Sequence, residues 1–141
     1  MSYSLTEFTD DHLPELRRIF LDARRETFSW NDPEGYKLED FDSVIRGEIV
    51  LVAVENNAPI GFIAWWPPEN FIHSLFVDPQ FTGTGAGKLL LDGCLEQLER
   101  PAALKCLQAN KKALGFYKAQ GWEITGEGGS EEGNYYFMSL Y

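Results

Sequence analysis

The stretch best suited to chemistry covers residues 80–88, QFTGTGAGK, where three glycines alternate with other residues. It lies between the apolar segment FIHSLFVDP and the segment LLLDGCLEQLE, which has helical spacing. The first N–H groups of a helix have no partner within the helix and attract anions. Glycine has no Cβ atom to hold an anion away from the backbone. The pattern therefore predicts an anion-binding turn, with a plain tight turn before a helix as the alternative.

Two common phosphate-binding loops do not fit this stretch. A Walker A loop requires glycine where Thr82 stands, and serine or threonine where Leu89 follows the lysine. A dinucleotide-binding fingerprint that begins at Gly83 requires a third glycine at the position of Lys88. Lys88 falls in the first helical turn, where the helix dipole alone favours an acid. A bound anion nearby would account for this lysine.

The composition narrows the class of protein. A length of 141 residues predicts one domain, and a hydrophobic content of 44% is enough for a core. The net charge of −10 argues against a nucleic-acid partner, which requires a basic face. No apolar run reaches the roughly 20 residues that cross a bilayer, and the N-terminal segment lacks the features of a secretion signal. We therefore expect a cytoplasmic protein with no membrane partner.

The chain offers few metal ligands. Its cysteines are Cys94 and Cys106, which form no close Cys-x-x-Cys pair, and its histidines are His12 and His73. This set is too small for a structural zinc site, so no metal is expected. Both cysteines have apolar neighbours, which predicts that they pack in the core.

Hydrophobic periodicity and turn signals predict a mixed α/β domain. The expected helices cover residues 10–26, 38–46, the stretch from the glycine turn to Pro101, and 111–120, which Gly121 ends. The expected strands cover residues 49–55, 60–66, 71–77, 104–110, 122–128 and 134–141. The order is two helices, three strands, a helix, a strand, a helix and two strands.

Two segments resemble motifs of the GNAT superfamily of N-acetyltransferases. The segment FVDPQFTGTGAGKLLL is similar to the acyl-CoA-binding pattern V-x-P-x-aromatic-R/Q-G-x-G-x-G-x-x-L, matched by Val77, Pro79, Phe81, Gly83, Gly85, Gly87 and Leu90. Thr82 departs from the usual arginine or glutamine. The segment NKKALGFYKAQGW is similar to the pattern N-x-x-A-x-x-F-Y-x-x-x-G-F, matched by Asn110, Ala113, Phe116, Tyr117, Gly121 and Trp122.

The resemblance implies one domain over residues 1–141 with the GNAT-type acyl-CoA N-acyltransferase fold. That fold is a central, mixed, mostly antiparallel sheet of six to seven strands, flanked by about four helices. It also implies acetyl-CoA as co-substrate and no metal. The residues it places against acetyl-CoA are Leu75, Phe76, Val77, Thr82, Gly83, Thr84, Gly85, Ala86, Gly87, Lys88, Asn110, Phe116 and Tyr117. Strand residues 75–77 would splay from the neighbouring strand and offer free backbone groups.

The implied reaction is attack of a neutral amine on a thioester, which requires proton transfers at both ends. By resemblance, Tyr117 donates a proton to the departing thiolate, and packing beside Phe116 is the alternative. Asn110 would hydrogen-bond the pantetheine arm, or else only cap a helix. His73 is the candidate base, because an imidazole takes up a proton near neutral pH. A water chain or Glu69 or Glu26 remain alternatives.

The position of His73 depends on strand parity. Simple alternation places His73 on the same strand face as Leu75 and Val77, and a bulge would break this parity.

The acceptor pocket implied by the resemblance lies between the first helix–helix connection and the last hairpin. Trp30, Tyr36 and Trp65 are the candidate walls, and nearby acids would favour a cationic acceptor. We expect a small-molecule or amino-acid-like primary amine. The alternatives are a protein or peptide amine, and an acyl-CoA-binding module without catalysis. A homodimer is also open, because dimers are common in this superfamily.

Overall fold

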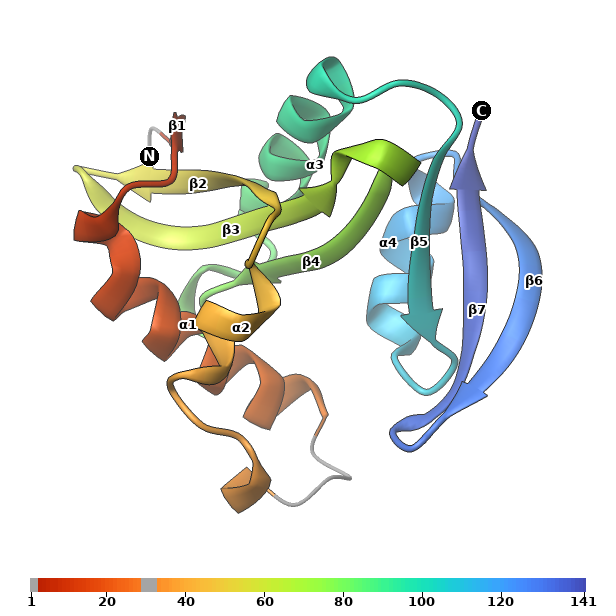
Figure 1. Ribbon diagram of the computed structural model, residues 1–141, viewed down its shortest axis with the longest axis horizontal. Coiled ribbons are helices and arrows are strands. Elements are labelled where there is room, and N and C mark those ends of the chain that lie inside the picture. The colour runs from red at the N-terminus through yellow and green to blue at the C-terminus, as the bar shows by residue number, and fades with distance from the viewer. Residues whose placement is uncertain (1–2, 29–32) are drawn as a thin grey trace.

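The computed structural model describes residues 3–28 and 33–141. Within these ranges, seven strands form one sheet in the order β1-β2-β3-β4-β5-β7-β6 (Figure 1). The strands are β1 Ser4–Glu7, β2 Ile49–Glu55, β3 Ala58–Trp66, β4 Phe71–Val77, β5 Ala102–Leu107, β6 Glu123–Ser130 and β7 Gly133–Leu140. Neighbouring strands are antiparallel except for β4 and β5, which are parallel. The predicted mixed, mostly antiparallel α/β fold is confirmed.

Helices cover both faces of the sheet (Figure 1). They are α1 Leu13–Thr27, α2 Asp40–Val44, α3 Ala86–Gln97 and α4 Lys111–Ala119. One core contains Leu16, Ile19 and Phe20 of α1. The other contains Leu90 and Cys94 of α3. Because both faces are covered, β2 and β3 are apolar along nearly their whole length, as the runs IVLVAVE and IGFIAWW indicated.

Strand β1 was not expected from the sequence. It pairs antiparallel with β2, with Ser4 opposite Val54 and Glu7 opposite Leu51. It is a short edge strand whose residues are half-buried or exposed, so it carries no apolar run that would reveal it. Within the described residues, no helix is both long and apolar enough to cross a bilayer.

A bulge in β4 overturns the predicted parity of His73. Ser74 lies opposite Ala64 of β3, and Ile72 lies opposite the next residue, Trp65. His73 is therefore an extra residue without a partner on β3. Consequently Ile72, rather than His73, packs in the same core as Leu75.

Candidate active site

The parallel strands β4 and β5 pair over only two residues of each strand. Phe71 lies opposite Ala103, and Ile72 lies opposite Leu104. Beyond this point the two strands run apart (Figure 1). A cleft of about 1520 Å³ opens there, and its lining includes both Leu75 on β4 and Leu107 on β5. The edge of β4 after Ile72 therefore faces the cleft without a β5 partner in the ladder, which is the splay that was expected for residues 75–77.

The glycine turn follows β4 and leads into α3. Gly83 and Gly85 have φ angles of +77° and +96°, which side chains other than glycine rarely adopt. A Cβ atom at either position would meet no heavy atom within 4 Å, so both glycines face open space. Gly85 is the N-cap of α3, and the first-turn amides that follow it have no partner inside the helix. This turn fits the backbone cradle expected for a pyrophosphate.

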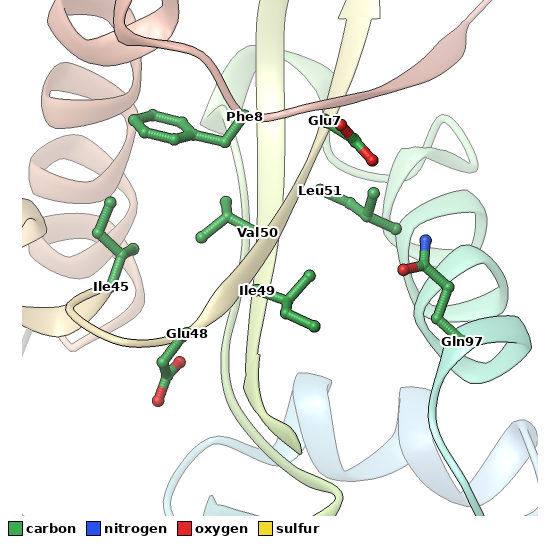
Figure 2. A pocket seen from close by; sticks show the side chains of 8 residues that line it. All are labelled: Glu7, Phe8, Ile45, Glu48, Ile49, Val50, Leu51 and Gln97. Carbon is green, nitrogen blue, oxygen red and sulfur yellow. The ribbon is translucent and has the colours of Figure 1, made fainter. Parts of the chain in front are cut away.

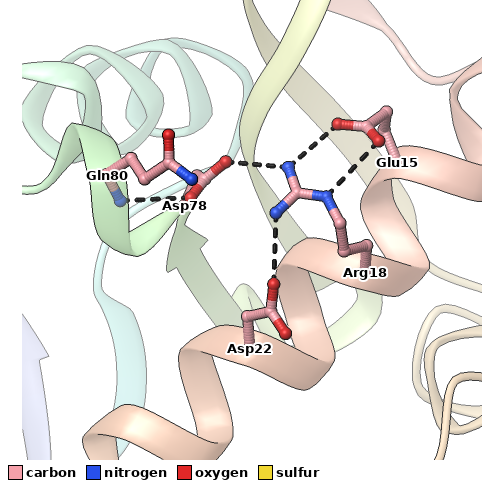
Figure 3. Close-up of polar contacts among 5 residues, drawn as sticks. All are labelled: Glu15, Arg18, Asp22, Asp78 and Gln80. Atoms are coloured by element: carbon pink, nitrogen blue, oxygen red, sulfur yellow. Dashed lines mark hydrogen bonds and ion pairs between the residues drawn. The ribbon is translucent and has the colours of Figure 1, made fainter.

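A buried carboxylate fixes the start of this turn. Asp78 is 3% exposed, and its Oδ1 accepts a hydrogen bond from the backbone N–H of Gln80 at 3.1 Å. Its Oδ2 accepts one from the guanidinium of Arg18 on α1 at 2.8 Å. Arg18 also binds Glu15 and Asp22, so three carboxylates surround it (Figure 3). Hydrogen bonds from Arg18 to Glu15 and Asp78 raise the pKa of the guanidinium above its ordinary value.

Tyr117 lies on α4 and lines the cleft. Its ring packs edge-on against Phe116 and Trp122, with centroids 5.4 and 5.8 Å away. Burial raises the pKa of its phenol well above the ordinary value, and the Cys106 and Cys94 thiols raise it further. The hydroxyl therefore stays protonated at neutral pH and is available as a proton donor.

Asn110 is the N-cap of α4, and it also lines the cleft. Its Oδ1 accepts a hydrogen bond from the backbone N–H of Ala113 at 3.2 Å. The capping alternative is therefore present in the structure. It uses only the oxygen of the amide, so the Nδ2 group remains a potential donor toward the cleft.

Most of the residues expected to contact the donor line the cleft. They are Leu75, Phe76, Val77, Thr82, Gly83, Gly85, Gly87, Lys88, Asn110, Phe116 and Tyr117. The other two, Thr84 and Ala86, are not among the residues that line the cleft. The Thr84 hydroxyl donates to the carbonyl of Phe81, and Ala86 is buried at the start of α3. Lys88 forms a surface ion pair with Asp92 at 2.7 Å.

The predicted acceptor wall is only partly present in the cleft. Tyr36 lines it, but the guanidinium of Arg24 already lies 4.6 Å from the centre of the Tyr36 ring. Trp65 is 1% exposed and packs in the core against α3, so it does not line the cleft. Its side chain lies inside the core whose partly buried members Leu75 and Tyr117 line the cleft. Trp30 lies outside the described residues.

His73 and Glu48 form a pair at the cleft. Both residues line it, and the Nδ1 atom of His73 lies within hydrogen-bonding distance of Oε2 of Glu48. The histidine side chain is 47% exposed, whereas that of Glu48 is 7% exposed. Glu48 also borders a smaller cavity of about 360 Å³ (Figure 2). Sequence reasoning missed Glu48, which lies 25 residues from His73 in a connection with no motif.

The two buried cysteines are unreactive at neutral pH, although Cys106 lines the cleft. Burial raises the pKa of the Cys94 thiol to about 12 and that of the Cys106 thiol to about 11. Both thiols are free and protonated at neutral pH, so they are poor nucleophiles. The prediction that they pack in the core is confirmed.

The comparisons with known proteins agree with this geometry. The family model of the acetyltransferase (GNAT) family matches residues 13–122. The chain belongs to this family. A segment of 92 residues is 33% identical to the peptidyl-lysine N-acetyltransferase YjaB of Escherichia coli and covers 64% of this chain and 60% of that protein.

Two further similarities extend the comparison. A segment of 85 residues is 30% identical to the peptidyl-lysine N-acetyltransferase YjaB of Salmonella typhimurium and covers 60% of this chain and 57% of that protein. The match thus spans less than two thirds of the length of either relative. The PaiA N-acetyltransferase of Thermoplasma acidophilum, solved in complex with coenzyme A, shares the fold with a TM-score of 0.83, at 18% identity and over the full length of both chains.

Proposed function

We propose that this protein transfers the acetyl group of acetyl-CoA to the side-chain amine of a lysine in a protein or peptide. The observation that carries the proposal is the fork after Ile72 and Leu104, which opens onto the glycine turn. An unpaired strand edge beside a helix start provides backbone donors for both the acyl arm and a diphosphate. The names of the two YjaB relatives support lysine as the acceptor.

The part of the cleft between the glycine turn and the free edge of β4 would hold acetyl-CoA, which supplies an activated thioester. The amides of residues 82–88 would bind its diphosphate, and the free edge of residues 75–77 would hold the acyl arm. A backbone N–H on that edge would stabilise the oxyanion that forms during attack. Asn110 and Phe116 would contact the arm, and the protonated Tyr117 would donate to the departing thiolate.

Three carboxylates in the lining of the cleft would attract a cationic acceptor, beside the cationic side chains Arg24, Lys105 and Lys112 that also line it. These carboxylates belong to Glu26 at the end of α1, and to Glu131 and Glu132 in the turn between β6 and β7. A lysine side chain is a primary ammonium at neutral pH and must lose a proton before it attacks. Carboxylates at the entrance would attract the ammonium, and His73 would take its proton.

A free small-molecule amine is the second candidate acceptor. Tyr36 in the lining supports it, because an aromatic ring can pack against a small amine. The ring face covered by Arg24 is unavailable for a cation, which makes an aromatic cage less suitable here than a carboxylate entrance. We therefore rank this acceptor after lysine.

The test is an acetylation assay that follows free thiol release from acetyl-CoA. The substrates are a lysine peptide with a blocked N-terminus, the same peptide with arginine in place of lysine, and a panel of small amines. Turnover with only the lysine peptide supports the proposal. Turnover with only small amines overturns the choice of acceptor. Binding of acetyl-CoA without any turnover would instead indicate an acyl-CoA-binding module.

A further inference from the structure

Glu48 and His73 come together from distant parts of the chain at the point where the fork opens. Glu48 directly precedes β2, and His73 is the bulged residue of β4. The bulge leaves His73 without a partner in the ladder between β3 and β4. His73 directly follows Ile72, which is the last residue of β4 paired with β5. The imidazole therefore lies at the start of the strand edge that faces the cleft.

The environment of the pair distinguishes the two ring nitrogens of His73. Nδ1 faces the Glu48 carboxylate, which accepts a hydrogen bond only from an N–H group when it is ionised. A neutral His73 in this arrangement carries its proton on Nδ1, so its Nε2 has a free lone pair. The ring of Phe71 packs against the imidazole, with a centroid 4.7 Å away.

Glu48 is the buried member of the pair. Its side chain is 7% exposed, and among the described residues nothing donates a hydrogen bond to its Oε1. A buried carboxylate with so little solvation is stabilised by a positive charge on its partner. Proton uptake at Nε2 creates that positive charge. Figure 2 shows that the carboxylate points away from the apolar side chains of Phe8, Val50 and Leu51, so it is not part of their packing.

We infer that Glu48 is a positioning residue that holds His73 in the Nδ1–H tautomer, so that Nε2 takes the proton of the acceptor ammonium. This inference rests on the proposed function. His73 Nε2 accepts one proton from the ammonium, and the resulting neutral amine forms a bond to the thioester carbon. The carbon–sulfur bond then breaks, the thiolate takes a proton, and the amide nitrogen loses its second proton to water.

The tautomer of His73 is measured without any substrate. Long-range ¹H–¹⁵N spectra of the imidazoles identify which ring nitrogen carries the proton, and the chain has only two histidines. His12 is an internal control, because its Nδ1 accepts a hydrogen bond from the backbone N–H of Thr9 at 3.0 Å. Neutral His12 must therefore carry its proton on Nε2. We expect the opposite tautomer for His73.

Two variants of Glu48 then separate positioning from packing. Glu48→Met keeps the length of the side chain but removes both acceptors, and Glu48→Gln keeps an amide oxygen that can accept from Nδ1–H. In Glu48→Met we expect His73 to change to the Nε2–H form and kcat to fall at least about tenfold, with the KM for acetyl-CoA unchanged. In Glu48→Gln we expect the Nδ1–H form and an intermediate kcat. Unchanged His12 signals confirm that the fold is retained.

The outcomes distinguish this inference from the proposed function. An Nε2–H tautomer in the wild type, or full turnover in Glu48→Met, overturns the role of Glu48 while acetyl transfer stands. The expected tautomers without wild-type turnover on any amine overturn the proposed function, and the proton uptake by His73 with it. The expected tautomers together with the loss of kcat support both.

Discussion

Ile72 and Leu104 are the last pair in the parallel ladder between β4 and β5. After this pair the strands separate, and the cleft between them reaches from the start of α3 to the turn between β6 and β7. The glycine turn, α4 and the His73–Glu48 pair all border this cleft. The position of one strand pair thus determines where the donor and the acceptor would meet.

The phenol of Tyr117 is expected to act at the chemical step. Tyr117→Phe removes the only proton that this side chain can donate but keeps the ring that packs against Trp122. We expect kcat to fall about 100-fold or more, because a general acid contributes that much, while the Kd for acetyl-CoA changes little. Steady-state kinetics and calorimetry measure the two quantities.

A matched control is available on β7. Tyr136 is partly buried against the core that also contacts Tyr117, but it does not line the cleft. Tyr136→Phe should leave kcat near the wild-type value. Equal kcat in Tyr117→Phe and the wild type would show that Tyr117 is not the acid.

The buried Asp78 is expected to stabilise the fold and the glycine turn together. Asp78→Asn removes the charge that faces Arg18 and weakens the hydrogen bond to the N–H of Gln80. We expect a loss of about 1–3 kcal/mol in the free energy of unfolding, measured by urea denaturation. Asp22→Asn removes an exposed partner of the same Arg18, and its loss should stay below about 1 kcal/mol. Equal losses in the two variants would contradict the role of burial.

Alkaline pH is expected to destabilise the protein through its buried thiols. Burial raises the pKa of Cys94 from 9.0 to about 12 and that of Cys106 from 9.0 to about 11. At a pH between 9.0 and the raised pKa of each thiol, the unfolded chain has lost the thiol proton that the folded chain keeps. The free energy of unfolding should therefore be constant with respect to the thiols below pH 9 and fall above it, by up to about 1.4 kcal/mol per pH unit for each thiol.

Denaturation curves at several pH values between 8 and about 10.5 measure this slope. Cys94→Ala should be less stable at every pH because it leaves a cavity, but its stability should fall less steeply above pH 9. The same slope in the variant and the wild type would refute the assignment to this thiol.

The acidic turn between β6 and β7 is expected to select cationic acceptors. The double variant Glu131→Gln and Glu132→Gln removes two exposed charges from the entrance of the cleft. The KM for the lysine peptide should rise several-fold and become less sensitive to salt, while the KM for acetyl-CoA stays constant. An unchanged KM for the peptide would place the acceptor elsewhere.

The strands of the core and the glycine turn could be predicted because their signals are local. The runs IVLVAVE and IGFIAWW are apolar throughout, and residues 80–88 combine a turn with a helix start. Strand β1 could not be predicted, because its stability comes from pairing with β2 rather than from its own pattern. The bulge at His73 depends on the register between β3 and β4, which no single strand encodes.

The polar contacts of the site were the hardest to predict, because they join segments that are distant in sequence. Arg18 and Asp78 are 60 residues apart, and Glu48 and His73 are 25 residues apart. A glutamate directly before a buried strand was the one available hint for Glu48. Trp65 was misjudged because its burial comes from the packing of β3 against other elements, which the pattern of the strand alone does not reveal.

The most direct measurement is a calorimetric titration of acetyl-CoA into the wild type, Gly85→Ala and Gly115→Ala. The first variant places a Cβ atom in the open turn at a φ angle of +96°, and the second places one on α4 outside the cleft. We expect saturable binding to the wild type and to Gly115→Ala, and binding about tenfold weaker, or ~1.4 kcal/mol, for Gly85→Ala. No heat from the wild type at millimolar acetyl-CoA, or equal affinity in all three proteins, would contradict binding of the acetyl-CoA diphosphate by the amides of residues 82–88.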